Sequence, residues 1–363
     1  MSDTDTESVV ERVRGAVARG ATVRDAIVTE VRSAHERSLG MAAGIDIDER
    51  EVSERVDGFG ALQPLLDDPT IEEIWFNDHS AVFVARAGVH ERLALTIGGD
   101  EVRSLVERML RRTGRRIDYS QPFVDASLPD GSRLHVVIPP ITRESWSVNI
   151  RKFSRAIRSL EDLVSAGTLT QSSATVLTDA VRGGLTVLVA GATQAGKTTM
   201  LTALCGVLPP GERIVTVEET FELALPNSDV VGMQCRGPSL EGLGEVTLRR
   251  LVRETLRMRP TRIVVGEVRG DEALDLLVAL NSGVPGLCTI HANSAGDAVR
   301  KLATLCQLAG GISADFITAT IIATVDLVVH CRMEEDGARR VTDIARPVVG
   351  PAGITMESVW SPS

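Results

Sequence analysis

The stretch GATQAGKTT, residues 191–199, decides the fold and the ligand of this chain. It fits the phosphate-loop pattern G-x-x-x-x-G-K-[ST], in which backbone N–H groups and the positive end of the following helix hold phosphate oxygens. The lysine of such a loop reaches the terminal phosphates, and the threonine hydroxyl ligates magnesium. We therefore expect a nucleotide and Mg²⁺ to be bound by the loop residues Gly191, Ala192, Thr193, Gln194, Ala195, Gly196, Lys197, Thr198 and Thr199.

The residues around the loop predict a strand before it and a helix after it. LTVLVAG (185–191) is an apolar run of strand length, and the helix predicted from Lys197 stops before Pro209 and Pro210. Only three of the 39 basic residues are lysines, and one of them is Lys197, where a flexible point charge has to reach phosphates. This context favours nucleotide binding over a structural turn.

Short buried strands alternate with helices from about residue 172 onward, which is typical of an open parallel sheet in an α/β domain. The four clearest strands are predicted at 185–191, 212–219, 261–268 and 286–292. Ligands of such sheets bind at the carboxyl ends of the strands. Polar residues at these ends are therefore the candidates for chemistry.

Three of these strands end in a residue with a possible catalytic role. Of the two acids in RIVTVEET, we expect Glu218 to orient or deprotonate an attacking water, although solvated strand ends are the alternative. Glu267 in RIVVGEVRG stands where phosphate-loop enzymes hold magnesium through water, so it joins Thr198 as a metal candidate. His291 in CTIHANS is expected to sense the γ-phosphate as a neutral imidazole, with a purely structural histidine as the alternative.

The remaining sequence divides into further segments. We expect a helical extension over 1–45, a smaller mixed α/β domain over 46–153, a helical linker or hinge over 154–171, a nucleotide-binding domain over 172–345 and a tail over 346–363. Phosphoryl transfer needs positive charge against the developing charge on the phosphate oxygens, and a second domain or subunit can deliver it. Arg133 and Arg151 in the smaller domain suit that role.

Composition limits the location and the partners. The chain carries a net charge of −10, with 43% hydrophobic and 24% charged residues, and no apolar run approaches the length of a transmembrane helix. The acidic, polar N-terminus lacks the features of a signal peptide, which predicts a cytoplasmic protein without a transmembrane segment. Five widely spaced cysteines indicate neither a disulfide framework nor a zinc site.

The order GATQAGKTT, RIVTVEET, RIVVGEVRG, TIHANS resembles the secretion ATPases of type II and type IV systems, and among them the CpaF-like or TadA-like ATPases of the tight-adherence (Flp) pilus branch. The likeness extends through FVDASLPDGSRLHVVIPPI and IRKF and covers about residues 57–345. It implies a RecA-like ATPase domain behind a smaller N-terminal domain, a hexameric ring, and ATP bound in the cleft between the domains. It also implies that Glu218, Glu267 and His291 belong to the acidic box, the second nucleotide motif and the histidine box, with Arg133 and Arg151 reaching the phosphates.

The sequence departs from this family pattern at several positions. Gln194 and Ala195 replace the small glycine and serine of GGTGSGKTT, Glu219 replaces an aspartate, and Val284 stands where histidine is usual. A missing glycine restricts the loop backbone, so nucleotide binding is a safer expectation than fast turnover.

The leading hypothesis is a motor that hydrolyses ATP at the inner face of the plasma membrane and pushes on a membrane platform protein, driving pilus assembly or protein secretion. One alternative is a nucleotide-gated assembly subunit with little hydrolysis, suggested by Gln194 and Val284. Another is a RecA-like nucleic-acid motor, but an aromatic content of 3% leaves few residues on which bases could stack, so no direct nucleic-acid partner is expected.

Overall fold

The structure is a computed structural model that describes residues 3–19, 21–38, 49, 52, 59–78, 81–111, 113–152, 159–237, 243–351 and 353–362. The chain separates into two compact units, one formed by residues 1–86 and 90–152 and the other by residues 87–89 and 153–363. Each unit is considered by itself below.

The first unit begins with two helices, α1 (Asp3–Ala18) and α2 (Val23–Ser38). Valines at positions 9, 10 and 13 lie on one face of α1 and are buried against alanine, isoleucine and valine side chains of α2. Both helices fall within the extension expected over 1–45, of which residues 39–45 lie outside the described residues.

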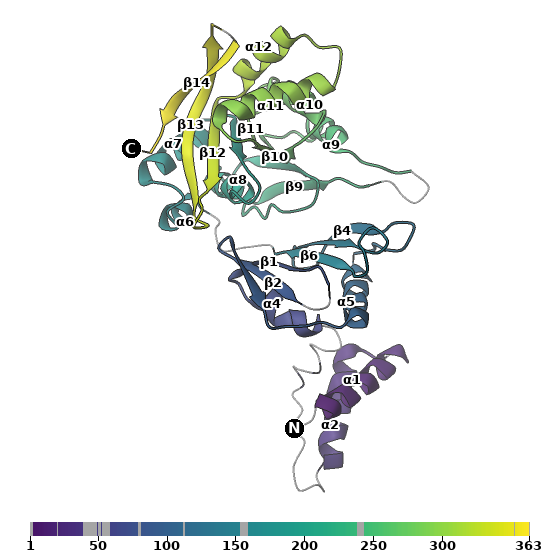
Figure 1. The fold of residues 1–363 in the computed structure, drawn as a ribbon. Coiled ribbons are helices and arrows are strands. Elements are labelled where there is room, and N and C mark those ends of the chain that lie inside the picture. Colours follow the sequence, from purple (N-terminus) through teal and green to yellow (C-terminus); the bar gives the residue numbers. More distant parts are fainter. Residues whose placement is uncertain are drawn as a thin grey trace. The chain divides into compact units, whose positions relative to one another are not determined.

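The rest of this unit is an antiparallel sheet with a helix. Its strand order is β3-β2-β1-β6-β5-β4, and Figure 1 labels β1, β2, β4 and β6 of this sheet. The amphipathic helix α5 buries Val102, Leu105, Val106 and Met109 in the same core as the inward residues of the strands. The bounds are Gly60–Leu62 for the 3-10 helix η1, Gln63–Asp67 (α4), Ile71–Phe76 (β1), Val82–Arg86 (β2), Val89–Leu93 (β3), Gly99–Arg111 (α5), Phe123–Ser127 (β4), Arg133–Val137 (β5) and Ser147–Arg151 (β6).

The second unit is built on an eight-stranded sheet with the order β14-β13-β12-β7-β11-β10-β8-β9. Figure 1 labels β9 to β14 of this sheet. The six strands from β12 to β9 are mutually parallel, and β13 and β14 are antiparallel to their neighbours. The strands are Val187–Gly191 (β7), Arg213–Glu218 (β8), Asp229–Gln234 (β9), Arg262–Val268 (β10), Gly286–His291 (β11), Leu327–Met333 (β12), Arg339–Gly350 (β13) and Gly353–Trp360 (β14). The α/β fold with a parallel sheet is therefore confirmed.

Helices cover both faces of this sheet because its central strands are buried on both sides. In β7, Leu188 and Ala190 contribute to one core and Val187 and Val189 to the other. The first core contains residues of α9 to α12, and the second contains residues of α6 to α8. These helices are Leu160–Ser165 (α6), Gln171–Arg182 (α7), Lys197–Gly206 (α8), Leu248–Thr255 (α9), Glu272–Leu280 (α10), Ala295–Leu308 (α11) and Ala314–Thr324 (α12).

Two expectations about the ends of this unit need correction. Residues 346–363 are no tail, because β13 continues to Gly350 and β14 pairs with it from Gly353 to Trp360. The residues expected to form a hinge over 154–171 include α6, whose Leu160 and Leu163 are buried in the second core, so this helix is part of the second unit. Residues 154–158 lie outside the described residues.

Candidate nucleotide site

The sheet order brings the predicted motifs to one edge. The phosphate loop joins β7 to α8, β11 lies beside β7, and β10 and β8 follow. His291 at the end of β11 is the register partner of Gly191 at the end of β7. Because all four strands are parallel, their carboxyl ends lie at the same edge, as such sheets require for a ligand site.

The loop backbone is shaped by close approach and by two left-handed residues. A Cβ on Gly191 would lie 2.5 Å from the backbone oxygen of Cys331 on β12, so only glycine fits there. Gly196, directly before α8, has φ of +87°. Gln194 has φ of +63°, a conformation that glycine adopts freely and that costs a residue with a side chain.

Lys197 is held inside the loop. Its side chain is largely buried, its Nζ donates a hydrogen bond to the carbonyl of Ala192 at 2.8 Å, and the same Nζ lies 3.2 Å from Nδ1 of His291. An ammonium group has no acceptor, so Nδ1 of His291 must be the unprotonated nitrogen and Nε2 carries the proton.

His291 connects the lysine to an acid. Its Nε2 lies 2.6 Å from Oε1 of Glu267. Burial and then the positive charge of Lys197 lower the pKa of His291 below its ordinary value, although Glu267 opposes this. The geometry and the direction of the pKa shift both support the neutral imidazole expected from the sequence.

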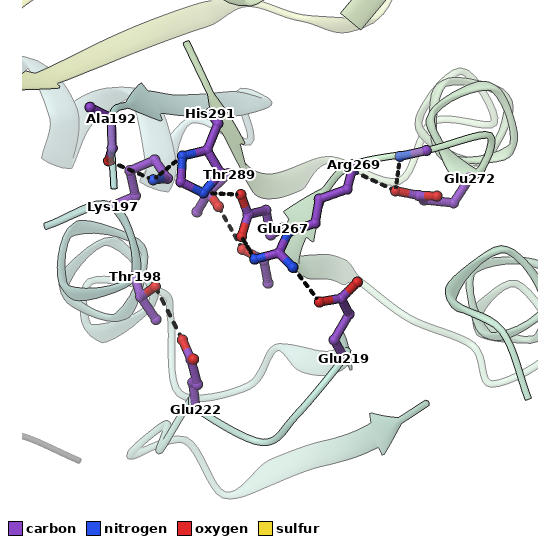
Figure 2. A network of polar contacts seen from close by, with 12 residues as sticks. Ala192, Lys197, Thr198, Glu219, Glu222, Glu267, Arg269, Glu272, Thr289 and His291 are labelled. Atoms are coloured by element: carbon purple, nitrogen blue, oxygen red, sulfur yellow. Dashed lines mark hydrogen bonds and ion pairs between the residues drawn. The ribbon is translucent and has the colours of Figure 1, made fainter. Parts of the chain in front are cut away.

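Glu267 continues the chain of contacts to an arginine. Its Oε2 accepts from Arg269 Nη2 at 2.6 Å, and Arg269 Nη1 donates to Glu219 at 2.7 Å. Figure 2 shows Lys197, His291, Glu267, Arg269 and Glu219 as one continuous series of contacts. Lys197 and Glu219, directly after β8, are therefore linked through a continuous series of polar contacts.

Glu218 contacts neighbouring groups through both of its carboxylate oxygens. It is buried, and its Oε2 accepts from the backbone N–H groups of Glu222 and Leu223 at 2.7 and 2.9 Å. Its Oε1 accepts from the hydroxyl of Thr216 at 3.1 Å. Burial raises the pKa of Glu218 above its ordinary value, against the opposing effect of the backbone hydrogen bonds. One oxygen thus holds the segment that follows β8, and the other contacts Thr216 within β8. The role of Glu218 toward a water stays a prediction.

The acid that reaches the loop is Glu222, which sequence reasoning missed. Its Oε2 accepts from the hydroxyl of Thr198 at 3.3 Å (Figure 2). Its only signal in the sequence was its place four residues after Glu218, in the same acidic segment. A second missed residue is Arg339 on β13, whose Nε donates to the carbonyl of Gln194 at 3.0 Å.

The donors around Thr198 fit magnesium. Its hydroxyl and the neighbouring carboxylate of Glu222 are hard oxygen groups, the kind that Mg²⁺ prefers. Among the described residues there is no group of three or more His, Cys, Asp or Glu side chains placed to hold a metal by themselves.

The two predicted arginines are cross-strand neighbours in the first unit. Arg133 begins β5, Arg151 ends β6, and the two are directly opposite in the antiparallel register. Arg151 also faces Glu73 of β1 across the neighbouring ladder, so a negative charge lies on the other side of that arginine.

Known proteins with similar sequences share most of the chain. A model of the family described as "Type II/IV secretion system protein" matches residues 55–355. A Mycobacterium tuberculosis chain named for conjugal transfer is 36% identical over 319 residues, 86% of this chain and 90% of that protein. The type IV secretion system protein PtlH of Bordetella pertussis is 34% identical over 320 residues, 78% of this chain and 92% of that protein.

Solved structures agree on the fold. The ATPase DotB of Yersinia pseudotuberculosis aligns with a TM-score of 0.57 and 16% identity over 78% of this chain and 76% of that chain. An identity this low supports the fold alone. In the part of the chain that the structure describes, no helix combines the length and the apolar character needed to cross a membrane.

Proposed function

The chain belongs to the type II/IV secretion system protein family, and from this premise we propose that it is a magnesium-dependent ATPase that powers secretion or pilus assembly. The observation that carries the proposal is the series from Lys197 through His291 to Glu267 beside the phosphate loop. A structural turn of the same sequence would not need a buried lysine in contact with a neutral histidine.

The loop residues divide the work of binding and hydrolysis. Lys197, which now donates to the Ala192 carbonyl, would bind oxygens of the terminal phosphates, and the Thr198 hydroxyl, which now donates to Glu222, would be a ligand of the metal. Mg²⁺ neutralises charge on the β- and γ-phosphates when it is bound. Glu222 takes a proton from the attacking water, and the water oxygen bonds to the γ-phosphorus. The bond between the γ-phosphorus and the bridging oxygen breaks at the same time, so that ADP leaves with that oxygen.

His291 and Glu267 report on the γ-phosphate. Lys197 Nζ now lies between the loop and His291, so a phosphate that attracts the lysine removes one partner of the imidazole. The change passes to Glu267 and from there to Arg269 and Glu219. We propose that Glu267 is the carboxylate that would hold magnesium when the ion is bound.

Arg133 and Arg151 supply positive charge from the first unit, of the same subunit or of a neighbour. Their cross-strand pairing concentrates two guanidinium groups on one face of the β5–β6 ladder. Such groups stabilise the transition state of phosphoryl transfer and typically raise turnover by orders of magnitude.

We further propose that the chain works as a hexameric ring at the cytoplasmic face of the plasma membrane, on a platform protein of a secretion system. The motif order and the extent of the resemblance favour the tight-adherence (Flp) pilus branch. Prepilin genes and genes for multi-span membrane proteins beside the gene for this chain would support that branch, and conjugation genes alone would oppose it.

The proposal is tested by phosphate release over a series of protein concentrations, with sedimentation in parallel. We expect hydrolysis of ATP only with Mg²⁺, at a specific activity that rises over the range in which rings form. A specific activity independent of concentration contradicts the ring. An absence of phosphate release at any concentration contradicts the ATPase.

One observation favours a second candidate, a nucleotide-gated subunit that turns over little ATP. Gln194 adopts a left-handed conformation in the middle of the loop. This conformation costs free energy for a residue other than glycine, and the cost applies to each step of the ATPase cycle in which the loop keeps this shape. Tight ATP binding and ring formation without phosphate release would select this function.

A further inference from the structure

The hairpin formed by β12 and β13 extends past the end of β7 and returns over the phosphate loop. In the parallel pair, Cys331 of β12 is the register partner of Gly191, the last residue of β7. The hairpin then continues to Met333, which pairs with Arg339 at the start of β13. Arg339 is therefore placed beyond the strand end, at the level where the loop begins.

The side chain of Arg339 lies along the outside of the loop. Its Nε donates to the carbonyl of Gln194 at 3.0 Å. A Cβ on Gly196 would lie 3.2 Å from Cδ of Arg339, so the aliphatic part of the side chain passes close over that residue. The arginine thus contacts both left-handed residues of the loop, Gln194 and Gly196.

The peptide between Gln194 and Ala195 links this arginine to the lysine. Because a trans peptide points its C=O and N–H in opposite directions, holding the carbonyl of Gln194 also fixes the N–H of Ala195. That N–H closes a turn onto the carbonyl of Ala192 at 3.3 Å. The same carbonyl accepts from Nζ of Lys197 at 2.8 Å.

We propose that Arg339 is a positioning residue that holds the phosphate loop in its binding shape and thereby offsets the presence of glutamine at position 194. A glycine at 194 adopts the left-handed conformation without a Cβ penalty, so a loop with glycine needs no outside donor to keep it. A glutamine there favours other conformations, and the charged hydrogen bond from Arg339 counters that preference. The proposal deepens the proposed function and rests on nucleotide binding by this loop.

The test is a double-mutant cycle between positions 339 and 194. Full-length wild type, Arg339→Ala, Gln194→Gly and the double variant are compared in their affinity for a fluorescent ADP analogue. We expect Arg339→Ala to weaken binding about tenfold in the wild type, in keeping with loss of a charged hydrogen bond, and less than about twofold with glycine at 194. Arg339→Lys, which keeps a charged donor, should recover most of the loss.

The matched control is Arg340→Ala. Arg340 is the next residue on the same strand and donates to the carbonyl of Gly167 at 3.3 Å, so its removal should leave ADP affinity unchanged. Circular dichroism and the thermal midpoint establish that each variant is folded. An equal loss of affinity on removing Arg339 in both backgrounds overturns the proposal, and so does no loss in either.

Hydrogen exchange without nucleotide separates this inference from the proposed function. We expect the Ala195 amide to exchange faster in Arg339→Ala than in wild type, and at an unchanged rate when Arg339→Ala is added to Gln194→Gly. Exchange that is unaffected by Arg339→Ala in the wild-type background refutes the positioning role. Failure of the wild type to bind ADP refutes nucleotide binding, whatever the exchange result is.

Discussion

The choice between Glu222 and Glu218 as the catalytic base can be decided by two isosteric substitutions. Glu222→Gln keeps an oxygen that can accept from the Thr198 hydroxyl, now 3.3 Å away, but it removes the ability to take a proton. Loss of a positioned general base slows a reaction by about 10²–10⁴-fold, or about 3–5 kcal/mol in the barrier. Nucleotide affinity and the thermal midpoint should change little.

Glu218→Gln is the matched control, and its mild effect follows from the contacts of that side chain. The amide oxygen can take the position of Oε2 and accept from the N–H groups of Glu222 and Leu223, now 2.7 and 2.9 Å away. The amide nitrogen then faces the hydroxyl of Thr216, which can accept. Because burial raises the pKa of Glu218, a neutral isostere also removes a costly charge. We expect turnover within a few-fold of wild type.

Glu218→Ala should behave differently, because it leaves two backbone N–H groups without their acceptor. At about 1–3 kcal/mol for each unsatisfied group, the thermal midpoint should fall by roughly 4–12 °C. The assay is single-turnover hydrolysis with saturating ATP and Mg²⁺, alongside nucleotide affinity and thermal unfolding. A hundredfold loss in Glu218→Gln, with Glu222→Gln fully active, would refute the reasoning.

Three further predictions concern stability. Arg262 is buried and pairs with Glu212 at 3.0 Å, so Arg262→Ala leaves a poorly solvated acid and should cost about 3–5 kcal/mol, measured by urea unfolding. Gly191→Ala places a Cβ 2.5 Å from the backbone oxygen of Cys331; the strands must shift, which should cost about 1–3 kcal/mol and weaken nucleotide binding. Burial lowers the pKa of His330 from its ordinary value of 6.5. As the pH falls, this histidine is therefore protonated in the unfolded chain at a higher pH than in the folded protein, and the free energy of unfolding should decrease below about pH 6.5. In His330→Asn this fall should be smaller, and an identical pH dependence would contradict the buried neutral histidine.

The sequence predicted those parts of the fold that depend on neighbouring residues, namely the strand before the phosphate loop and the loop itself. The strand at 187–191 is a continuous buried run, and the glycine and lysine spacing after it reflects a backbone geometry that few other residues allow. Alignment of the strand ends followed from the parallel sheet, which is why Glu267 and His291 were found near Lys197. Their exact partners depend on side-chain packing that the pattern does not contain.

The sequence could not show which acid of the 218–222 segment faces the loop. That depends on the backbone after β8, which folds back so that its own N–H groups use Glu218. Arg339 lies far from Gln194 in the sequence, and only the pairing of β12 with β7 brings them together. The last strand, β14, was missed because it is a sheet edge with alternating half-buried and exposed residues and no apolar run.

The central claim is that this loop binds and hydrolyses ATP through Lys197, and steady-state phosphate release tests it most directly. Wild type and Lys197→Ala are compared at several protein concentrations, with Mg²⁺ and with the metal chelated. We predict turnover by the wild type with Mg²⁺, none after chelation, and a loss of at least about a hundredfold in Lys197→Ala, since charge stabilisation of the transferred phosphoryl group is removed. Equal phosphate release by the two proteins, or none by either at any concentration, would contradict the claim.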